Sequence, residues 1–409
     1  TAGFNEPAVA MERTLRGLEG WPVNVGLQAN ARSTDPATLD VLLDAGAVGF
    51  KIHEDFGAYP ELIDATLAFA EAHDVSVSLH TDGLHESAEL DDTVAAIAGR
   101  TVHAYHVEGS GGGHVPDVIG LVREPNVICS STTPTIPYGA SAANETVAMT
   151  AISHGASFAI AADLELVRER LHPATMAAEG PLHELGAIQI VNSDSQGMGR
   201  IMETVRRTFQ LAHAMKAWRA TPAGIGHPGL PEDSDEDDNA RILRYLAKVT
   251  IEPAITHGIS AHVGSLRPGR LADVVLWKPG YIGVKPWLVV KAGHLAWLPL
   301  GEGNATVRNT EPTRYGPDWA GVPHAAPSVA ATFVSASADP TALRRRLDSG
   351  RIFLPVEGLR GLSRSSLAWN RASPPVEVSP SDGSVALAGR SLAAEPLAEV
   401  PLSRRYFLR

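Results

Sequence analysis

The sequence predicts an α/β fold: an incomplete TIM-type (β/α)8 barrel with about six of its eight strands, a small β module and a C-terminal extension. Short apolar runs alternate with amphipathic helical patterns through the first half of the chain, which indicates a parallel sheet. Four of these runs end in a lysine, a histidine or an aspartate, and barrels carry their chemistry at the C-terminal ends of strands. From residue 262 onward, short alternating strands separated by Pro-Gly and Ala-Gly turns replace this pattern.

We expect six strands before residue 200, because each is an apolar run of the kind that is buried in a parallel sheet. In chain order the strands are expected at 22–29, 48–53, 75–80, 101–106, 127–130 and 188–194. Helices are expected at 36–45, 60–73, 89–98 and 115–122, followed by a long helix that ends near 218. A complete barrel needs eight strands. Either two strands are missing from the N-terminus, or the sheet is open.

The chain divides into three parts. Residues 1–255 form the partial barrel, and residues 140–180 lie in a long connection that we expect to form a flap over the barrel mouth. Residues 256–300 form the small β module. Residues 301–409 are rich in Ser, Ala, Pro and Arg and have weak periodicity, so we expect an irregular extension with some helix near 341–348.

Composition excludes several classes of protein. The 409 residues are 44% hydrophobic and carry a net charge of −12, which disfavours binding to nucleic acid or to an anionic membrane. No apolar run reaches the roughly 18 residues of a membrane span, and the N-terminus lacks the features of a signal peptide. The single cysteine, Cys129, excludes an intrachain disulfide and fits a reducing cytoplasm.

Four candidate strands end in potential metal ligands, Lys51, His80, His106 and Asp194. Parallel strands of a barrel bring their C-terminal ends to one mouth, so these side chains should converge. Imidazole and carboxylate suit zinc, nickel or iron. A single histidine at a strand end is more often structural, but four such residues in one chain make coincidence a poor explanation. A buried lysine there could lose its proton and react with carbon dioxide, and the resulting carbamate could bridge two metal ions.

A glycine cluster follows His106 directly, in Glu108-Gly109-Ser110-Gly111-Gly112-Gly113-His114. Glycines after a strand allow the backbone to approach a ligand closely. The cluster does not match a phosphate-binding loop, because no Lys-Ser or Lys-Thr follows and the glycine spacing differs. We interpret His103 and His114 as structural.

Longer motifs surround the candidate ligands. They are Lys51-Ile52-His53-Glu54-Asp55, His80-Thr81-Asp82, His106-Val107-Glu108-Gly109, Ser130-Ser131-Thr132-Thr133-Pro134-Thr135, Ser193-Asp194-Ser195-Gln196 and Thr250-Ile251-Glu252-Pro253-Ala254. In this order they resemble the urease catalytic (alpha) subunit, a metal-dependent amidohydrolase. The resemblance extends over nearly the whole chain and is weakest between 301 and 400.

The resemblance implies hydrolysis of urea to ammonia and carbamate at two nickel ions. By motif position, Lys51 would be the carbamylated ligand that bridges the two metals. His80 and His106 would hold one nickel ion, and Asp194 would bind the other. The ligand types alone would also admit zinc.

The resemblance also implies roles around the substrate. His53 would hydrogen-bond the urea oxygen. His154, in the flap, would be the general acid, and Asp55 and Arg170 would set its protonation and position. Backbone groups near the substrate would belong to Gly111 and Gly197.

The family carries a His-x-His pair on its first barrel strand, and this sequence contains none. We therefore expect another chain or segment to supply that strand, which agrees with a strand count that is two short. The family further suggests small urease beta- or gamma-type subunits, a trimeric assembly and nickel-insertion accessory proteins as partners. Ser153, Gly155 and Thr133 also depart from the family pattern.

Two alternatives stay open. A urease-like subunit without catalytic activity would keep the scaffold and lose the metals. A related amidohydrolase would act on another small amide or urea derivative.

Overall fold

The computed structural model describes most of the chain. The described residues are 7–53, 57–80, 90–110, 116–153, 155–195, 198–199, 201–234, 236–299, 313–315 and 325–401. No helix within these ranges is long and apolar enough to cross a membrane.

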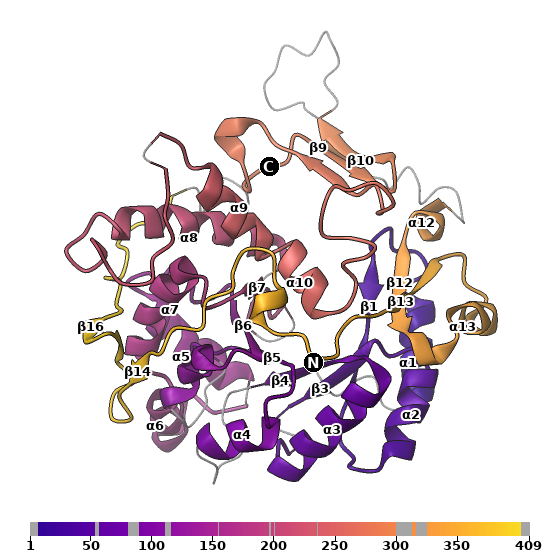
Figure 1. Ribbon diagram of the computed structural model, residues 1–409, viewed down its shortest axis with the longest axis horizontal. Helices are drawn as coiled ribbons and strands as arrows, with labels where there is room; N and C mark the ends of the chain where they lie inside the picture. Colours follow the sequence, from indigo (N-terminus) through magenta and orange to yellow (C-terminus); the bar gives the residue numbers. More distant parts are fainter. Residues whose placement is uncertain are drawn as a thin grey trace.

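A six-stranded parallel sheet forms the centre of the molecule, with its strands in chain order (Figure 1). The strands are β2 (Gln28–Asn30), β3 (Gly49–Ile52), β4 (Ser76–His80), β5 (Val102–Tyr105), β6 (Val127–Thr132) and β7 (Ile190–Asn192). The six strands expected before residue 200 are therefore confirmed. β2 and β7 are the two edges of this sheet. The fold is α/β, and the sheet is consistent with a partial TIM-type barrel.

The two faces of the sheet differ in chemistry. Phe50 of β3 packs against Phe69 of a covering helix, with ring centroids 5.7 Å apart, so its face of the sheet points toward the helices. Successive side chains of a strand point to opposite faces, so Lys51 lies on the inner face. Ser78 is the register partner of Lys51 and shares that face. The helix side is thus apolar, whereas the inner side carries polar groups.

The covering helices lie where the sequence pattern predicts them. They include α2 (Pro36–Asp44), α3 (Pro60–His73), α4 (Leu90–Ile97) and α8 (Thr204–Trp218). Asp35 caps α2 by accepting a hydrogen bond from the backbone N–H of Ala37. The segment Pro116–Arg123, expected as an α-helix, is a 3-10 helix instead.

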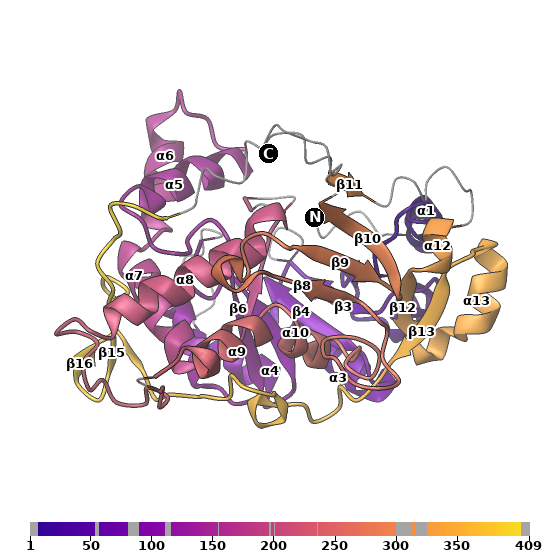
Figure 2. The same ribbon diagram turned by 90° about the horizontal axis from the view of Figure 1, so that it is seen from above.

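The long connection between β6 and β7 is helical, with no strand in its described residues. It contains α5 (Ala142–Ser153), α6 (Ala161–Glu169) and α7 (Pro173–Leu185). In Figure 2, α5 and α6 stand out from the body of the molecule, whereas α7 packs close to α8. This arrangement agrees with an expected flap, although the flap function itself stays a prediction.

A second, antiparallel sheet follows the barrel segment, as the turn pattern predicts. Its strands are β8 (Val274–Leu276), β9 (Leu288–Lys291), β10 (His294–Pro299) and β11 (Thr313–Tyr315), in the order β11-β10-β9-β8. Ala292 and Gly293 form the tight turn between β9 and β10, and both have positive φ angles, 49° and 84°. The sheet lies across one side of the parallel sheet (Figure 2) and includes β11, beyond the expected boundary at residue 300.

The C-terminal extension is more regular than expected. β12 (Ala331–Ser335), α13 (Pro340–Leu347) and β13 (Ile352–Val356) form a parallel β–α–β unit, and α13 confirms the helix expected near 341–348. β12 pairs with β1 (Val25–Gly26), which precedes β2 in the chain, and Figure 1 shows the unit beside β1. The β12 residues are all buried, so they lack the alternating pattern that marks a half-exposed strand.

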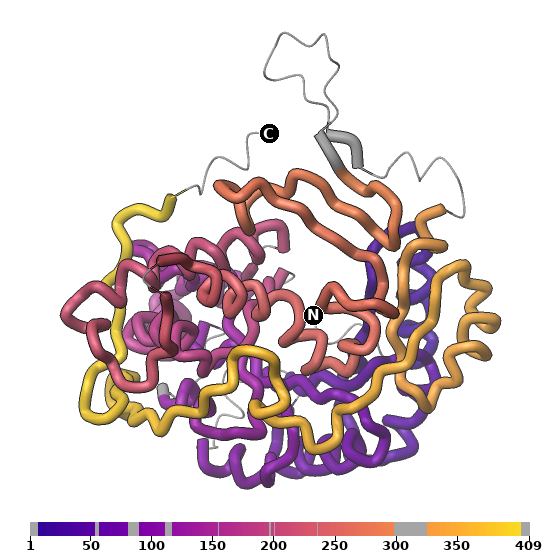
Figure 3. Tube along the Cα trace, turned by 45° about the horizontal axis from the view of Figure 1, so that its top comes forward, coloured from indigo at the N-terminus to yellow at the C-terminus, as the bar shows by residue number. Residues whose placement is uncertain are grey.

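The last described segment wraps around the outside of the barrel (Figure 3). The carboxylate of Asp74 accepts backbone hydrogen bonds from residues 358–360, and that of Glu252 accepts them from residues 368–370. Farther on, the indole of Trp218 donates to the carbonyl of Ala393. The segment also contains a small antiparallel sheet of β14 (Glu377–Val378), β15 (Val385–Leu387) and β16 (Arg390–Ser391).

A buried arginine joins the β–α–β unit to the N-terminal segment. Arg351 is 1% exposed, and its guanidinium donates to the carbonyls of Leu18, Trp21, Val23 and Ala331 and to the hydroxyl of Thr332. The segment that contains Leu18 and Trp21 follows α1 (Ala8–Gly17).

Replacement of this arginine should destabilise the whole chain. Arg351→Ala leaves several buried carbonyls without a donor, so we expect the free energy of unfolding to fall by about 3 kcal/mol or more. Denaturant titration would measure the loss. Arg345→Ala, on the exposed face of α13, is the matched control and should change stability by less than about 0.5 kcal/mol. Equal stability of the two variants would contradict a joining role for Arg351.

Candidate functional site

The four predicted metal ligands lie at the C-terminal ends of their strands, and three of them, His80, His106 and Asp194, lie close together. The rings of His80 and His106 lie 4.7 Å apart, and Nε2 of His106 lies 3.9 Å from Oδ1 of Asp194. Nζ of Lys51 lies 3.6 Å from the ring centroid of Tyr105, the residue directly before His106. Lys51, His80 and His106 are buried, and the Asp194 side chain is one-quarter exposed. We call these four residues the strand-end cluster.

The predicted substrate and acid–base residues are only partly described. The ring of His53 lies 3.9 Å from that of His80, at 31° to it, so His53 adjoins the strand-end cluster. Arg170 caps the C-terminal end of α6, in the flap connection. The other four, Asp55, Gly111, His154 and Gly197, lie outside the described residues, and their roles stay predictions.

Two members of the strand-end cluster have unusual backbone conformations. The φ angles of His106 and Asp194 are +53° and +45°, in the left-handed region that non-glycine residues seldom adopt. Such strain occurs preferentially at functional sites. After Asp194 the chain turns back sharply, because the Gly199 N–H donates to the Asp194 carbonyl over 2.7 Å. A Cβ on Gly199 would lie 1.4 Å from the Ser193 carbonyl oxygen, so this turn requires glycine.

A hydrogen-bonded histidine pair lies on the inner side of the sheet. Nδ1 of His103 is 3.2 Å from Nε2 of His257, which follows α10 (Ile251–Thr256). Burial, reinforced by the neighbouring His257, holds the pKa of His103 well below its ordinary value. Burial and the positive charge of Lys51 lower the pKa of His257 to about 4. Both rings are therefore neutral at pH 7.

Two buried carboxyl groups form a second network that the sequence analysis missed. Oε1 of Glu108 accepts hydrogen bonds from Ser110 over 2.5 Å and from Thr132 over 3.3 Å. Oε1 of Glu179, on α7, accepts one from Thr135 over 3.0 Å. Burial raises the pKa of Glu108 to about 7, and burial together with the nearby Glu108 raises the pKa of Glu179 well above its ordinary value. The one available signal was a glutamate within the otherwise apolar stretch of α7.

This carboxyl pair should make the protein less stable as the pH rises. A carboxyl group with a raised pKa in the folded state binds more protons there than in the unfolded chain, from about pH 4.5 upward. The protein therefore loses stability as the pH rises from about 4.5 to the pKa of the folded state, which is about 7 for Glu108.

We expect Glu179→Gln to remove much of this loss. Denaturant titrations at pH 5 and pH 8 should show a decrease on the order of 2 kcal/mol in the unaltered chain and a clearly smaller decrease in the variant. Glu377→Gln, at an exposed position, serves as control and should keep the full decrease. An unchanged pH dependence in Glu179→Gln would show that the pair does not titrate in this way.

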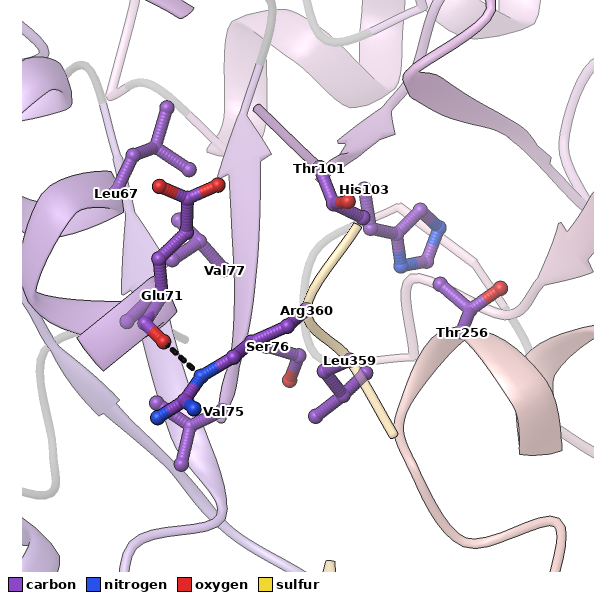
Figure 4. A pocket seen from close by; sticks show the side chains of 11 residues that line it. Leu67, Glu71, Val75, Ser76, Val77, Thr101, His103, Thr256, Leu359 and Arg360 are labelled. Carbon is purple, nitrogen blue, oxygen red and sulfur yellow. Dashed lines mark hydrogen bonds between the residues drawn. The ribbon is translucent and has the colours of Figure 1, made fainter. Parts of the chain in front are cut away.

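Two cavities differ in what they can hold. The small pocket of Figure 4 has about 20 Å³ and lies at the N-terminal ends of β4 and β5, where Ser76, Thr101 and His103 line it. It has room for about one water molecule. A second cavity has about 920 Å³. Its walls come from β1 and β2, from β8 of the second sheet, and from α9 (Asn239–Ala247) and α10. Its lining includes Gln28, Tyr105 and His257, so it reaches the inner side of the sheet.

The strand-end cluster suits a divalent metal in its chemistry but is short of donors. Two imidazoles, a carboxylate and an amine are ligands of the zinc and nickel class. Among the described residues, however, no group of three or more His, Cys, Asp or Glu side chains is arranged to hold a metal ion. A metal ion at this cluster would therefore need further donors, and a pair of metals would need more still.

These features are those of an α/β protein with polar side chains gathered at the strand ends of a parallel sheet. Residues 2–313 match the amidohydrolase family, and the chain belongs to that family. The superfamily uses divalent metals, commonly zinc. The match does not point to urease in particular.

Solved structures show only distant similarity. One is a Xaa-Pro dipeptidase with bound methionine, at 18% identity over 64% of this chain and 57% of that one, with a TM-score of 0.39. A putative prolidase from Bifidobacterium longum has 19% identity over 66% and 61%, with a TM-score of 0.40. An L-hydantoinase (dihydropyrimidinase) from Arthrobacter aurescens has 16% identity over 71% and 73%, with a TM-score of 0.40. The chain spans about six tenths of the length of the first two proteins.

Proposed function

We propose that this chain is a urease-type catalytic polypeptide, which hydrolyses urea to ammonia and carbamate. The observation that carries the proposal is that Lys51, His80, His106 and Asp194 lie at the C-terminal ends of four strands of one parallel sheet, with His106 close to both His80 and Asp194. The family sets the reaction class, hydrolysis of a carbon–nitrogen bond. The choice of urea rests on the motifs around these residues.

In this proposal the strand-end cluster holds two metal ions, nickel by resemblance. His80 and His106 would bind one ion, and Asp194 would bind the other. Lys51 would lie between them as a carbamate, formed when its neutral amine bonds to the carbon of carbon dioxide and releases one proton. When bound, the metals would polarise the urea carbonyl and lower the pKa of a bound water molecule.

The remaining residues would bind urea and deliver a proton to its departing nitrogen. His53, whose ring lies beside that of His80, would donate a hydrogen bond to the urea oxygen. A closing flap would exclude bulk water, and His154 would protonate the departing nitrogen. Asp55 and Arg170 would set the protonation and position of His154, and the backbones of Gly111 and Gly197 would contact the substrate.

The proposal includes a partner segment that supplies two further histidines. The donor shortage of the strand-end cluster supports it. On the resemblance alone we extend it to small urease-type subunits, a trimeric assembly and nickel-insertion proteins. The cytoplasmic location expected from Cys129 belongs to the same proposal.

The decisive experiment replaces the bridging lysine. Lys51→Ala should lose its metal and its hydrolysis of urea, because the variant lacks the proposed bridging ligand. Metal analysis by mass spectrometry and an ammonia-release assay, both on the complete assembly, would measure this. Lys216→Ala, at an exposed position on α8, is the matched control and should keep both. Full activity in Lys51→Ala would rule out the assignment.

The same assays separate the two alternatives. A well-ordered assembly without metal would support the inactive scaffold, which the absence of a three-ligand group among the described residues favours. Faster turnover of substituted ureas or other small amides than of urea would support a different amidohydrolase.

A further inference from the structure

Tyr105 lies directly against the candidate bridging lysine. Nζ of Lys51 is 3.6 Å from the centroid of the Tyr105 ring, well within the range of about 6 Å in which an aromatic ring attracts a cation. Tyr105 is the last residue of β5 and pairs in register with His80, the last residue of β4. The ring is thus at the level of the strand-end cluster, where it can limit the positions that the flexible lysine side chain adopts.

The orientation of the tyrosine ring is itself held in place. Its hydroxyl shares a hydrogen bond with the hydroxyl of Ser78. The ring of His103 meets the Tyr105 ring edge to face, with centroids 4.3 Å apart at 89°. The ring is therefore held at two points, one polar and one aromatic.

Ser78 belongs to a hydrogen-bond chain that extends along the inner side of the sheet. Nε2 of Gln28 donates to Ser78 over 2.8 Å and to Ser76 over 3.4 Å. Ser76 is 3.4 Å from Nδ1 of His257, which in turn is bonded to His103. This series of hydrogen bonds thus leads back through His103 to the ring of Tyr105. Its members, which we call the inner chain, are Tyr105, Ser78, Gln28, Ser76, His257 and His103.

The composition of the inner chain calls for an explanation. Barrel interiors are usually filled by branched apolar side chains, which pack without any need for hydrogen bonds. Polar groups in the same place are costly unless they are paired, and a fully connected network rigidifies its surroundings. A series of hydrogen bonds that reaches the Tyr105 hydroxyl at one end, and the Tyr105 ring through His103 at the other, is suited to fixing that ring.

We propose that Tyr105 is a positioning residue for Lys51: its ring holds the lysine side chain at the mouth of the sheet, and the inner chain fixes the ring. A lysine side chain loses up to about 2 kcal/mol of rotamer entropy when it is ordered. Because the ring restricts Lys51 before any metal arrives, less of that entropy remains to be lost on metal binding. The link to metal binding rests on the proposed function, whereas the placement of Lys51 by Tyr105 does not.

The placement of Lys51 by Tyr105 can be tested by NMR without an activity assay. The chain has only six lysines, so a lysine label gives few signals. In metal-free protein labelled with 13C at the lysine ε position, the Lys51 signal should be shifted upfield by the ring and should vanish in Lys51→Arg. Lys278, whose Nζ lies 3.7 Å over the Trp287 ring, provides an internal reference that stays shifted in every folded variant.

Tyr105→Leu should abolish the Lys51 shift. Tyr105→Phe and Ser78→Ala, which remove the hydroxyl link, should reduce it. An unaltered Lys51 shift in Tyr105→Leu would overturn the proposal.

A calorimetric titration with Ni²⁺ alone, on the complete assembly, connects the placement to the metal. We expect Tyr105→Leu to weaken binding roughly 10- to 100-fold, as for other residues that orient a ligand, and Tyr105→Phe to weaken it less. Tyr281→Leu, at an exposed position, should bind as the unaltered protein does. Equal affinity in Tyr105→Leu and the unaltered protein would refute the positioning role even if urea is hydrolysed. If the unaltered protein binds no metal, the proposed function fails, and the lysine signal alone decides the placement.

Discussion

The alternation of side chains along parallel strands is the constraint on which the rest of this structure depends. It directs Phe50 toward the covering helices and Lys51, the next residue, toward the inner side of the sheet. Because neighbouring strands are in register, the serines of β4 share that side, and His80 and Tyr105 face each other across β4 and β5. A shift of one residue in any strand would exchange these sets and move the polar groups into the helix layer. The apolar packing of the helices and the chemistry of the strand ends are therefore maintained by the same register.

Burial of a lysine does not by itself make a functional site, as a second lysine in this chain shows. Lys248 is fully buried, and burial lowers its pKa to about 7. Its Nζ donates to the carbonyl of Ile188 over 2.6 Å, close to Glu252 and Glu184, which offset the burial. That environment is a structural one, because the amine is bonded to backbone and stabilised by carboxylates. Lys51 instead lies against the ring of Tyr105 near a strand end, where the residues proposed as metal ligands also lie.

Local patterns in the sequence could predict most of the sheet and its strand ends, because buried strands leave continuous apolar runs. The ends of those runs identified Lys51, His80, His106 and Asp194 without structural information. The features that were missed depend on partners distant in the chain. β12 becomes a strand by pairing with β1, some 300 residues earlier, and its own five residues, which include Thr332 and Ser335, form no continuous apolar run. The role of Gln28 is equally invisible in sequence, since its contacts with Ser76 and Ser78 arise only when β2 and β4 flank β3.

Electrostatics links modification of the lysine to metal binding in the proposed enzyme. Asp194 is the one carboxylate of the strand-end cluster, and a protonated Lys51 cancels its charge. Divalent cations placed beside an ammonium group would be repelled at short range in a medium that screens poorly. Conversion of the lysine to a carbamate changes its charge from +1 to −1, and that change replaces the repulsion with a bridging ligand. The neighbouring histidines cannot make the same change, because neutral imidazole binds a metal without contributing charge. In the proposed enzyme, carbamate formation and metal binding would therefore stabilise each other.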